Sequence, residues 1–368
     1  MIYTTKKKLQ FLFKKLTYGL FKLIYGEIKD FELAETNLKT KILTSQIDEK
    51  FNYKVFFVSK SRIYTDTIND TAIIQNNKIL EGPSFQIRNF KFEKAKNNIV
   101  LTKGTPRLKT KIKGNLASLL TGGAGNNNYW HWLFDVLPRL KIIKNTCDLD
   151  DIDYFLFPNL KNNFQKETLD LINISYKKRL YSTKYRHIEC DQIISTEHPY
   201  VINNDASNEI QNLPDWIIKW LKQSFTSNLE LKDKSFPKKI YIDRSDASQN
   251  IKLYRKIINE NEIINEVNNS GYRSIVLSNY SVISQMKFFF NANKIIGLHG
   301  AGFANLVFCS SQSSILELKP SNAGVVIKNL AEKCNLNYNC ISAVPEKFNL
   351  NNQLGHIIIK LEELKKYL

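Results

Sequence analysis

The chain has 368 residues, 43% of them hydrophobic and 12% aromatic, and a formal net charge of +18 at pH 7. The length suits two domains, and the apolar content excludes an intrinsically disordered chain. Lys, Asn and Ile are abundant together while Gly is scarce, and Lys and Arg form no long runs. The charge therefore predicts an anionic partner but does not indicate nucleic acid, because no recognition signature accompanies it.

The five cysteines are scattered and include no C-x-x-C pair. This spacing argues against a disulfide framework and against a zinc site, and it favours a reducing compartment. We therefore expect a cytoplasmic protein.

Residues 1–31 form a separate segment for which a basic amphipathic helix is predicted. Lys8, Lys15 and Lys22 recur every seven residues, with apolar residues between them, so a helix would have one basic and one apolar face. No uncharged run reaches the ~18 residues of a spanning helix, and no small-residue cleavage site follows. Two interpretations stay open. In the first, residues 6–24 lie on an anionic membrane surface and make the protein peripheral on the inner face of the membrane. In the second, they pack on the body of the protein.

The N-terminal domain is expected to cover residues 32–212. Short strand-like segments are separated by Asn, Gly and Pro, and they fall at residues 53–58, 71–74, 85–88, 98–102 and 116–120, ahead of Gly122, Gly123 and Gly125. Strands at 154–157 and 188–194 then alternate with a helix at 164–174, which is typical of an α/β layer. His187 and His198 flank the last strand and are expected at the surface.

Residues 148–153 contain a D-x-D sequence, which binds metal in another class of sugar transferase. Here it precedes a predicted strand instead of following one. We therefore interpret it as an acidic loop and predict no metal site.

The C-terminal domain is expected over residues 213–345. Strands at 239–243, 272–277, 295–296 and 314–318 alternate with helices at 214–221, 259–269 and 282–291. This Rossmann-like order places ligands beyond the carboxyl ends of the strands. Residues 355–367 predict a final amphipathic helix.

A glycine-rich turn follows the strand at 295–296. Gly297, Gly300 and Gly302 surround His299, and an amphipathic helix is predicted from Ala301. Backbone N–H groups at a helix start suit a phosphate, and a histidine there can donate to a phosphate or to a leaving oxygen. The alternative is a tight turn that binds nothing.

Three polar side chains fall at or just after predicted strand ends: Arg244, His299 and Glu317. Arg244 has the fork geometry for a diphosphate, and Glu317 could accept from ribose hydroxyls. Taken singly, Arg244 could instead pair with a neighbouring aspartate and Glu317 could cap a helix. Together they predict a nucleotide site.

An aromatic segment at residues 126–139 is the second candidate site. On a helix, His131 and Asp135 share one face, and this pair could orient an imidazole for general-base chemistry or bind a sugar hydroxyl. Trp130 could form part of an aromatic wall against sugar rings, and Arg139 follows. The alternative is a buried aromatic helix with a satisfied His–Asp contact.

Several of these segments together resemble glycosyltransferase family 61, whose bacterial members are often called capsular polysaccharide biosynthesis proteins. The segments are residues 128–139, 241–245, 255–260, 285, 297–305 and 315–318. The resemblance extends over roughly residues 50–345. The chain departs from it at Leu298, where relatives carry proline or a small residue, and in its basic N-terminal helix.

The resemblance implies an α/β, GT-B-like fold in which two Rossmann-like domains face each other across a cleft. It also implies an inverting, metal-independent hexosyl- or pentosyltransferase, without a cofactor beyond its nucleotide-sugar co-substrate, which is expected to be UDP-linked. The acceptor would be a glycan or a lipid-linked glycan. Residues 346–368 could then pack back on the N-terminal domain.

The resemblance also implies roles for single residues. The donor diphosphate and nucleotide would be bound by Arg244, Ser245, His299, Gly300, Ala301, Gly302, Asn305 and Glu317. One of His131 and Asp135 would be the catalytic base and the other would orient it. The acceptor sugar would be contacted by Tyr129, Trp130 and Arg139.

Two other functions stay open at this point. One is a different GT-B-like transferase of polysaccharide modification, such as a pyruvyl transferase, which would also need basic residues at a strand-end site. The other is a non-catalytic protein that binds a membrane surface through residues 6–24. Nucleic-acid binding is the third alternative, and it is not favoured because no recognition signature accompanies the charge.

Overall fold

The computed structural model describes residues 2–65, 71–84, 86–122, 127–227, 229–247, 255–346 and 355–368, with backbone alone for residues 2–11 and 14. The predicted positions Phe85, Gly123 and Gly125, and the side chain of Lys8, therefore lie outside the described residues. A mixed α/β fold is confirmed. The chain forms two compact units: unit 1 is Met1–Asn127, Phe134–Lys161 and Ile174–Ala206, and unit 2 is Asn128–Leu133, Asn162–Asn173 and Ser207–Leu368.

Unit 1 is built on a mixed sheet that has ten strands within the described residues. Its main path runs β1-β5-β4-β3-β12-β9-β10-β11, with β2 paired to β3 and β8 paired to β12. The strands are β1 (Asp30–Leu33), β2 (Thr40–Gln46), β3 (Asn52–Thr65), β4 (Thr71–Gln75), β5 (Lys78–Glu81), β8 (Thr110–Lys111), β9 (Asn115–Ser118), β10 (Tyr154–Phe157), β11 (Arg179–Tyr181) and β12 (His187–Thr196). A separate hairpin joins β6 (Ile87–Arg88) to β7 (Lys91–Phe92).

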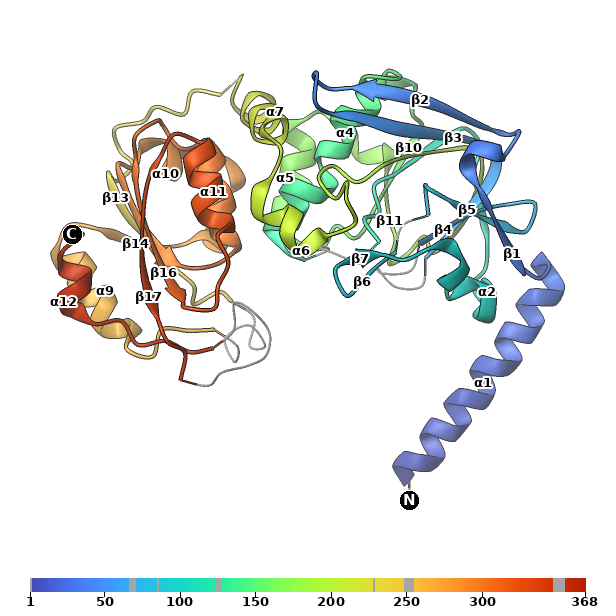
Figure 1. Cartoon of the computed structure of the whole chain (residues 1–368), viewed down its shortest axis with the longest axis horizontal. Helices are drawn as coiled ribbons and strands as arrows, with labels where there is room; N and C mark the ends of the chain where they lie inside the picture. Colours follow the sequence, from blue (N-terminus) through green and yellow to red (C-terminus); the bar gives the residue numbers. More distant parts are fainter. Residues whose placement is uncertain are drawn as a thin grey trace. The chain divides into compact units, whose positions relative to one another are not determined.

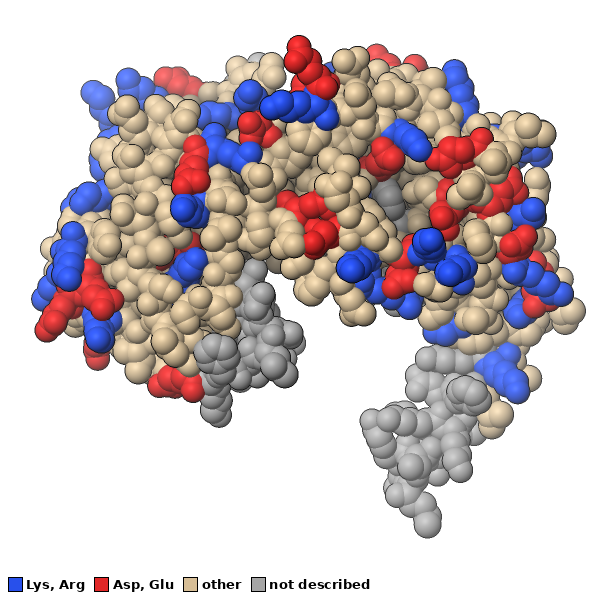
Figure 2. Space-filling model, viewed as in Figure 1, with Lys and Arg blue, Asp and Glu red and all other residues tan. Residues whose placement is uncertain are grey.

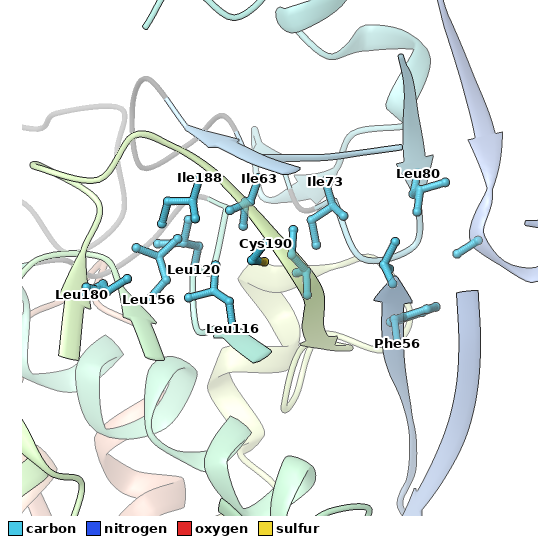
Figure 3. Packing of buried hydrophobic residues seen from close by; sticks show 13 residues of the cluster. Phe56, Ile63, Ile73, Leu80, Leu116, Leu120, Leu156, Leu180, Ile188 and Cys190 are labelled. Atoms are coloured by element: carbon cyan, nitrogen blue, oxygen red, sulfur yellow. The ribbon is translucent and has the colours of Figure 1, made fainter. Parts of the chain in front are cut away.

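The core of unit 1 lies where β3 and β12 run antiparallel through the middle of the sheet. Figure 3 shows Ile63 of β3 close to Ile188 of β12 and Leu116 of β9, and Phe56 of β3 at the other end of the same cluster. These side chains are almost completely removed from water. At about 25 cal/mol per Å² of buried apolar surface, this cluster contributes strongly to the stability of the unit.

The helices of unit 1 are few, and one replaces a predicted strand. They are α1 (Ile2–Tyr25), α2 (Val100–Lys103), α4 (Pro138–Lys144), the π-helical η3 (Trp132–Val136), which begins in unit 2, and the 3₁₀ turns η1 (Ala34–Thr36), η2 (Ala95–Asn97), η4 (Leu149–Asp151) and η5 (Tyr176–Lys178). The strand predicted at residues 98–102 is wrong, because Asn98 accepts from the Val100 N–H and starts a helical turn. Its alternation of apolar residues is too short to distinguish the two structures.

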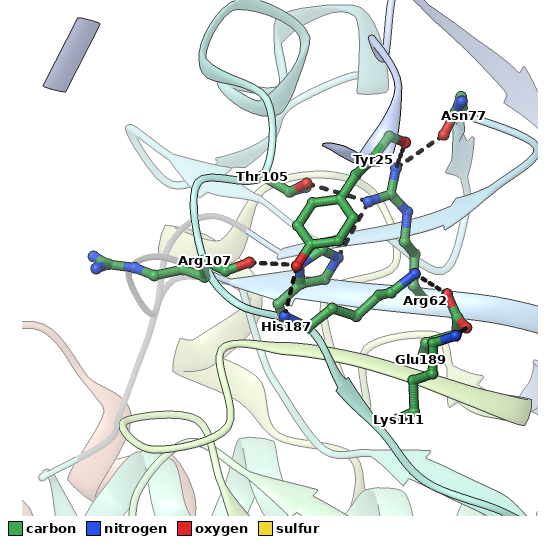
Figure 4. Close-up of polar contacts among 9 residues, drawn as sticks. Tyr25, Arg62, Asn77, Thr105, Arg107, Lys111, His187 and Glu189 are labelled. Atoms are coloured by element: carbon green, nitrogen blue, oxygen red, sulfur yellow. Dashed lines mark hydrogen bonds and ion pairs between the residues drawn. The ribbon is translucent and has the colours of Figure 1, made fainter. Parts of the chain in front are cut away.

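The carboxyl end of α1 is attached to unit 1 by a buried arginine and a buried histidine (Figure 4). Arg62 on β3 donates from Nη1 to Nε2 of His187 at 3.2 Å and from Nη2 to the Tyr25 carbonyl oxygen at 3.5 Å. Nδ1 of His187 lies 3.1 Å from the carbonyl oxygen of Arg107. Since a guanidinium only donates, Nε2 accepts and Nδ1 carries the proton. His187 is therefore a buried, neutral residue, and its predicted surface position is wrong.

This arrangement predicts a loss of stability in mild acid. Burial, with the Arg62 charge, lowers the pKa of His187 from 6.5 to about 4. Below pH 6.5 the unfolded chain takes up the proton first, so the free energy of unfolding falls until the pH reaches the folded pKa near 4. We expect a loss of about 2 kcal/mol between pH 7 and pH 5 in urea denaturation. His187→Gln can replace both hydrogen bonds without titrating and should lack this component; equal pH dependence of the two proteins would contradict the assignment.

Unit 2 contains a parallel sheet with the order β14-β13-β15-β16-β17 in the part of the chain that is described. The strands are β13 (Lys239–Asp243), β14 (Arg273–Val276), β15 (Lys294–Leu298), β16 (Ser314–Pro320) and β17 (Asn337–Ala343). Their apolar runs are continuous because helices cover both faces. After β14 the chain crosses β13 and continues on its other side with β15, so the strand order reverses between β13 and β15.

Helices cover both faces of this sheet. The helices of unit 2 are α3 (Tyr129–His131), α5 (Asn163–Leu171), α6 (Ala206–Glu209), which begins in unit 1, α7 (Asp215–Thr226), α9 (Glu260–Asn269), α10 (Val282–Asn291), α11 (Val326–Lys333), α12 (Leu361–Lys365) and the 3₁₀ segments η6 (Ile210–Asn212), η7 (Leu277–Asn279) and η8 (Ala301–Phe308). In Figure 1, α9 and α12 lie on one side of the sheet and α10 and α11 on the other.

The C-terminal segment differs from its prediction. Its helix is limited to α12, and Ile357 pairs with Ile257 in an isolated parallel bridge ahead of it. Leu364 joins the core of unit 2 together with Tyr241 and Ile263. The segment therefore packs on unit 2, and the idea that it returns to the N-terminal domain is wrong for its described residues 355–368, because their apolar side chains are buried on the sheet of their own unit.

Candidate functional site

The carboxyl ends of β13 and β15 define the candidate site in unit 2. In an open parallel sheet, ligands bind outside the carboxyl ends of the strands where the strand order reverses. Arg244 follows β13 directly and His299 follows β15 directly. The two residues therefore lie at the point of this sheet that is most favourable for a ligand.

Arg244 is packed against the glycine turn. Its Nη1 donates to the carbonyl oxygen of His299 at 2.9 Å. A Cβ atom on Gly300 would lie 3.1 Å from the Arg244 Cζ, so glycine at this position lets the guanidinium approach the backbone. Burial lowers the pKa of Arg244, although Asp246 and Glu260 oppose this. Next to it, Ser245 is exposed, and its N–H donates to the Asp243 carboxylate at 2.7 Å.

A second arginine accompanies Arg244. Burial and the charge of Arg244 lower the pKa of Arg255 to about 9, and the charge of Glu317 acts in the opposite direction. Two guanidinium groups that repel each other in a partly desolvated position stabilise a bound anion. The pair therefore makes this end of the sheet strongly attractive to an anion such as a phosphate.

His299 is fixed by a buried carboxylate. Its Nδ1 is in contact with Oε1 of Glu317, whose Oε2 accepts from the Tyr338 hydroxyl. The Glu317 side chain has no exposed surface, and it lies within β16, not at its end. Both carboxylate oxygens are thus engaged inside the protein, which corrects the predicted contact between Glu317 and a ribose.

The turn after His299 continues into η8, which is a 3₁₀ helix instead of the predicted α-helix. The first bond of this helix runs from the Phe303 N–H to the Gly300 carbonyl at 3.1 Å, so the amides of Ala301 and Gly302 precede it. A Cβ atom on Gly302 would lie 3.0 Å from Leu277 Cδ1. Glycine at position 302 is therefore favoured by apolar packing, and its predicted contact with the donor stays a prediction.

A hydrogen-bonded chain attaches α3 to η8 within unit 2. The Tyr129 hydroxyl donates to Oδ1 of Asn305 at 2.8 Å, and Nδ2 of Asn305 donates to Oε1 of Gln285 at 3.2 Å. Asn305 has no exposed surface, so its predicted contact with the donor is replaced by this internal role. Tyr129 was predicted to contact the acceptor sugar, and in the structure its hydroxyl donates to Asn305 instead. Since His131 belongs to the same short helix, α3 brings it to the unit that carries the arginines.

The order of these segments along the chain also matches a known family. A family model described as Glycosyltransferase 61 matches residues 129–316, which is more than half of the chain. The chain belongs to glycosyltransferase family 61. No curated protein matches it. The resemblance predicted from the motifs is confirmed, and membership assigns the chain to the enzymes that move a sugar from a donor to a glycan acceptor.

The residues matched by the family model include only part of the candidate site. Arg244, Arg255 and His299 lie inside the matched residues, whereas Glu317 and Tyr338 lie beyond them. The groups that surround His299 in this family 61 protein therefore come from both sides of that limit.

Two predicted acceptor residues are buried in the structure. Arg139 in unit 1 has no exposed surface, and its guanidinium donates to the Leu120 carbonyl at 2.6 Å and to the Thr196 hydroxyl at 2.9 Å. Trp130 in unit 2 is only 6% exposed. We therefore assign both residues to packing and correct their predicted contact with an acceptor sugar.

Asp135 is engaged inside unit 1. The π-helical η3 starts directly after His131, and the two residues fall into different units. Asp135 is 1% exposed, and its Oδ1 accepts from the Tyr200 hydroxyl at 2.8 Å. Its Oδ2 lies 3.9 Å from Nε2 of His198, which is buried in spite of its predicted surface position.

Arg255 and Tyr338 were missed as site residues. Arg255 belongs to a segment that carried the family resemblance, so its charge could have been included in the site. Tyr338 lies on β17, a strand that was not predicted. Pairing of β17 with β16 brings it to Glu317, and no local pattern indicates that contact.

Proposed function

We propose that this protein is an inverting, metal-independent hexosyl- or pentosyltransferase. Its donor would be a nucleoside-diphosphate sugar, specifically a UDP-sugar. The acceptor would be a hydroxyl of a glycan or lipid-linked glycan in surface or capsular polysaccharide biosynthesis. The observation that carries the proposal is the pair Arg244 and Arg255, both partly desolvated, at the reversal point of a parallel sheet beside His299. A diphosphate has the charge and the bidentate oxygens that this pair would bind.

The reaction would be a single displacement at the anomeric carbon. The acceptor hydroxyl gives its proton to a base, and the electron pair of the broken bond goes to the diphosphate oxygen. Arg244, Arg255 and the amides of Ala301 and Gly302 would stabilise the charge on that oxygen. His131 is our candidate base, because α3 attaches it to the unit that holds these groups.

A GT-B architecture is part of the proposal. Two observations support it: the chain forms two compact units, and unit 2 has a Rossmann-like parallel sheet. We assign the nucleotide-sugar to unit 2 and the acceptor side to unit 1. A nucleic acid partner is not proposed, because basic and acidic side chains are interspersed over the face drawn in Figure 2.

A nucleotide-sugar screen tests the proposed function. UDP, GDP, ADP and dTDP, each free and linked to common sugars, are compared by thermal shift, and any stabilising donor is then tested for hydrolysis and transfer. We expect one nucleoside diphosphate to stabilise the protein, and its stabilisation to be lost in Arg255→Met. Turnover of phosphoenolpyruvate without response to any nucleotide would favour a pyruvyl transferase and overturn the proposal.

We also propose that α1 binds an anionic membrane surface on the cytoplasmic side. Its side chains Leu12, Phe13, Leu16, Leu20, Leu23 and Ile24 are between 55% and 86% exposed. None of the described helices has the length and apolar character needed to cross a bilayer. An exposed apolar stripe beside lysines such as Lys15 suits a helix that lies in the interface of an anionic bilayer.

Vesicle flotation checks this surface. The protein should float with vesicles containing phosphatidylglycerol and less with pure phosphatidylcholine. The triple change Leu16→Ser, Leu20→Ser and Leu23→Ser should abolish flotation. Leu38→Ser is the control, because Leu38 is a fully exposed leucine outside α1. Equal flotation of the triple variant and the control would contradict the proposal.

A further inference from the structure

Glu317 is a carboxylate at a position where charge is costly. It lies on β16 between β15 and β17, and none of its surface is exposed. A buried carboxylate persists only when charged or hydrogen-bonding partners compensate for the lost water. Those partners are His299 and the Tyr338 hydroxyl.

The contact between Glu317 and Nδ1 fixes the tautomer of His299 and favours its charged form. A carboxylate accepts, so Nδ1 carries a proton and any proton that the ring gives to a ligand leaves from Nε2. The backbone N–H of His299 donates to the Leu318 carbonyl at 2.8 Å, which holds the residue beside β16. A negative charge in contact with the ring favours the imidazolium form.

Other charged groups near the ring act on the same equilibrium. Arg244 is bonded to the His299 carbonyl oxygen, and Arg255 interacts with Arg244 and with Glu317. Both are cations, which disfavour a third positive charge on His299. A bound diphosphate would offset the arginines, and Glu317 then decides the charge of the ring.

We propose that Glu317 and Tyr338 are positioning residues that hold His299 as an imidazolium whose Nε2–H faces the leaving diphosphate. The inference rests on the proposed function in that it assumes a diphosphate at this site. As the bond from the anomeric carbon to the diphosphate oxygen breaks, its electron pair goes to that oxygen. Nε2 gives its proton to the same oxygen, and His299 is left neutral with Nδ1–H still bonded to Glu317.

Histidine NMR tests this relay, in which Glu317 and Tyr338 control the protonation of His299, without a substrate. The chain has only 5 histidines, so selectively labelled histidine gives a small set of signals, and His299→Asn assigns one of them. In Glu317→Gln the titration midpoint of His299 should fall by about one pH unit or more. The other histidines serve as internal references. An unchanged midpoint would overturn the proposal.

Two further variants separate positioning from folding. Tyr338→Phe keeps the carboxylate but removes one of its donors, and it should change the midpoint of His299 while the other histidine signals stay in place. Glu266→Gln removes a carboxylate that pairs at 3.5 Å with Lys365 elsewhere in unit 2, and it should change nothing. An identical midpoint in wild type and Tyr338→Phe would remove Tyr338 from the relay.

UDP affinity as a function of pH connects the relay to the proposed function. Affinity for UDP should decrease as His299 loses its proton, and in Glu317→Gln this decrease should occur at lower pH. UMP, which lacks the second phosphate, should show a smaller difference. If the NMR midpoint moves but no variant binds UDP, the relay stands and the proposed UDP donor fails. If UDP binds with the same pH dependence in both proteins, the relay fails and the donor site stands.

Discussion

Replacing Arg244 by methionine is expected to lower kcat for sugar transfer by about 10³-fold, the usual cost of removing a group that stabilises developing charge. Arg244 lies at the carboxyl end of β13, and its guanidinium contacts the turn that carries His299. In the transition state the departing diphosphate gains charge, so a fixed cation stabilises it more than it stabilises the bound donor. Methionine keeps the length of the side chain but removes its charge and its donors.

The measurement is steady-state turnover with the donor identified by the nucleotide screen. Arg244→Lys keeps the charge without the planar fork and should recover only part of the activity, because lysine cannot bind two oxygens in one plane. The control is Arg273→Met in the same unit, where the Arg273 guanidinium lies 5.9 Å from the centre of the Phe288 ring. Near-normal turnover in Arg244→Met would remove Arg244 from the donor site.

The elements around this site could be predicted because their patterns are local. The strand at 239–243 and the helix at 282–291 occur in the structure with the predicted bounds. Buried parallel strands are short apolar runs, and helices between them show the 3.6-residue period. The placement of Arg244 follows from the first of these bounds, since a residue directly after a parallel strand must lie at the carboxyl edge. The strand predicted at 295–296 before His299 extends over 294–298 in the structure, so His299 follows it directly.

The interior contacts of the site could not be predicted, because they join residues that are distant in sequence. Tyr129 and Asn305 are 176 positions apart, and each was predicted to contact a ligand because polar residues in a glycine-rich or aromatic segment suggest one. Glu317 faces inward from a strand interior, where a carboxylate is unusual. Only the pairing of β15, β16 and β17 shows that its partners are His299 and Tyr338.

The predicted His131–Asp135 pair depends on the local helix geometry. A spacing of four residues places two side chains on one face only if the helix is regular. Here the backbone changes to a π-helix at Trp132, and such a stretch has more residues in each turn. The aromatic residues of this segment pack in the interior, and the Asp135 carboxylate accepts from the Tyr200 hydroxyl within unit 1. The roles of base and orienting group must therefore be tested separately.

His131→Ala is expected to lower kcat by about 10² to 10⁴-fold, the usual contribution of a general base. Its helix is attached to η8 through Tyr129 and Asn305, so the imidazole belongs to the unit that binds the donor in our proposal. A base must be neutral to accept a proton, so wild-type activity should decline in acid as the imidazole is protonated. Added imidazole should restore part of the activity of His131→Ala, because a free base can occupy the vacated position.

Asp135→Asn should behave differently. The carboxylate accepts from the Tyr200 hydroxyl, and His198 faces it from 3.9 Å. Nδ1 of His198 accepts from the backbone N–H of Val201 at 3.2 Å, so its Nε2 carries the proton and needs an acceptor. In Asp135→Asn an amide N–H group would face the Nε2–H group of His198, so two donors would oppose each other. We expect a loss of about 1 to 3 kcal/mol in the free energy of unfolding, with little change in kcat for the folded enzyme.

Comparing the two variants decides the assignment. Activity per folded molecule, with the folded fraction measured by urea denaturation, separates chemistry from stability. A large loss of kcat in Asp135→Asn, together with near-normal turnover in His131→Ala, would reverse the roles and make Asp135 the base. The structure favours His131 because the Asp135 carboxylate is already engaged inside unit 1. Its oxygens would have to leave the Tyr200 hydroxyl and the neighbouring His198 before they could accept a proton from an acceptor sugar.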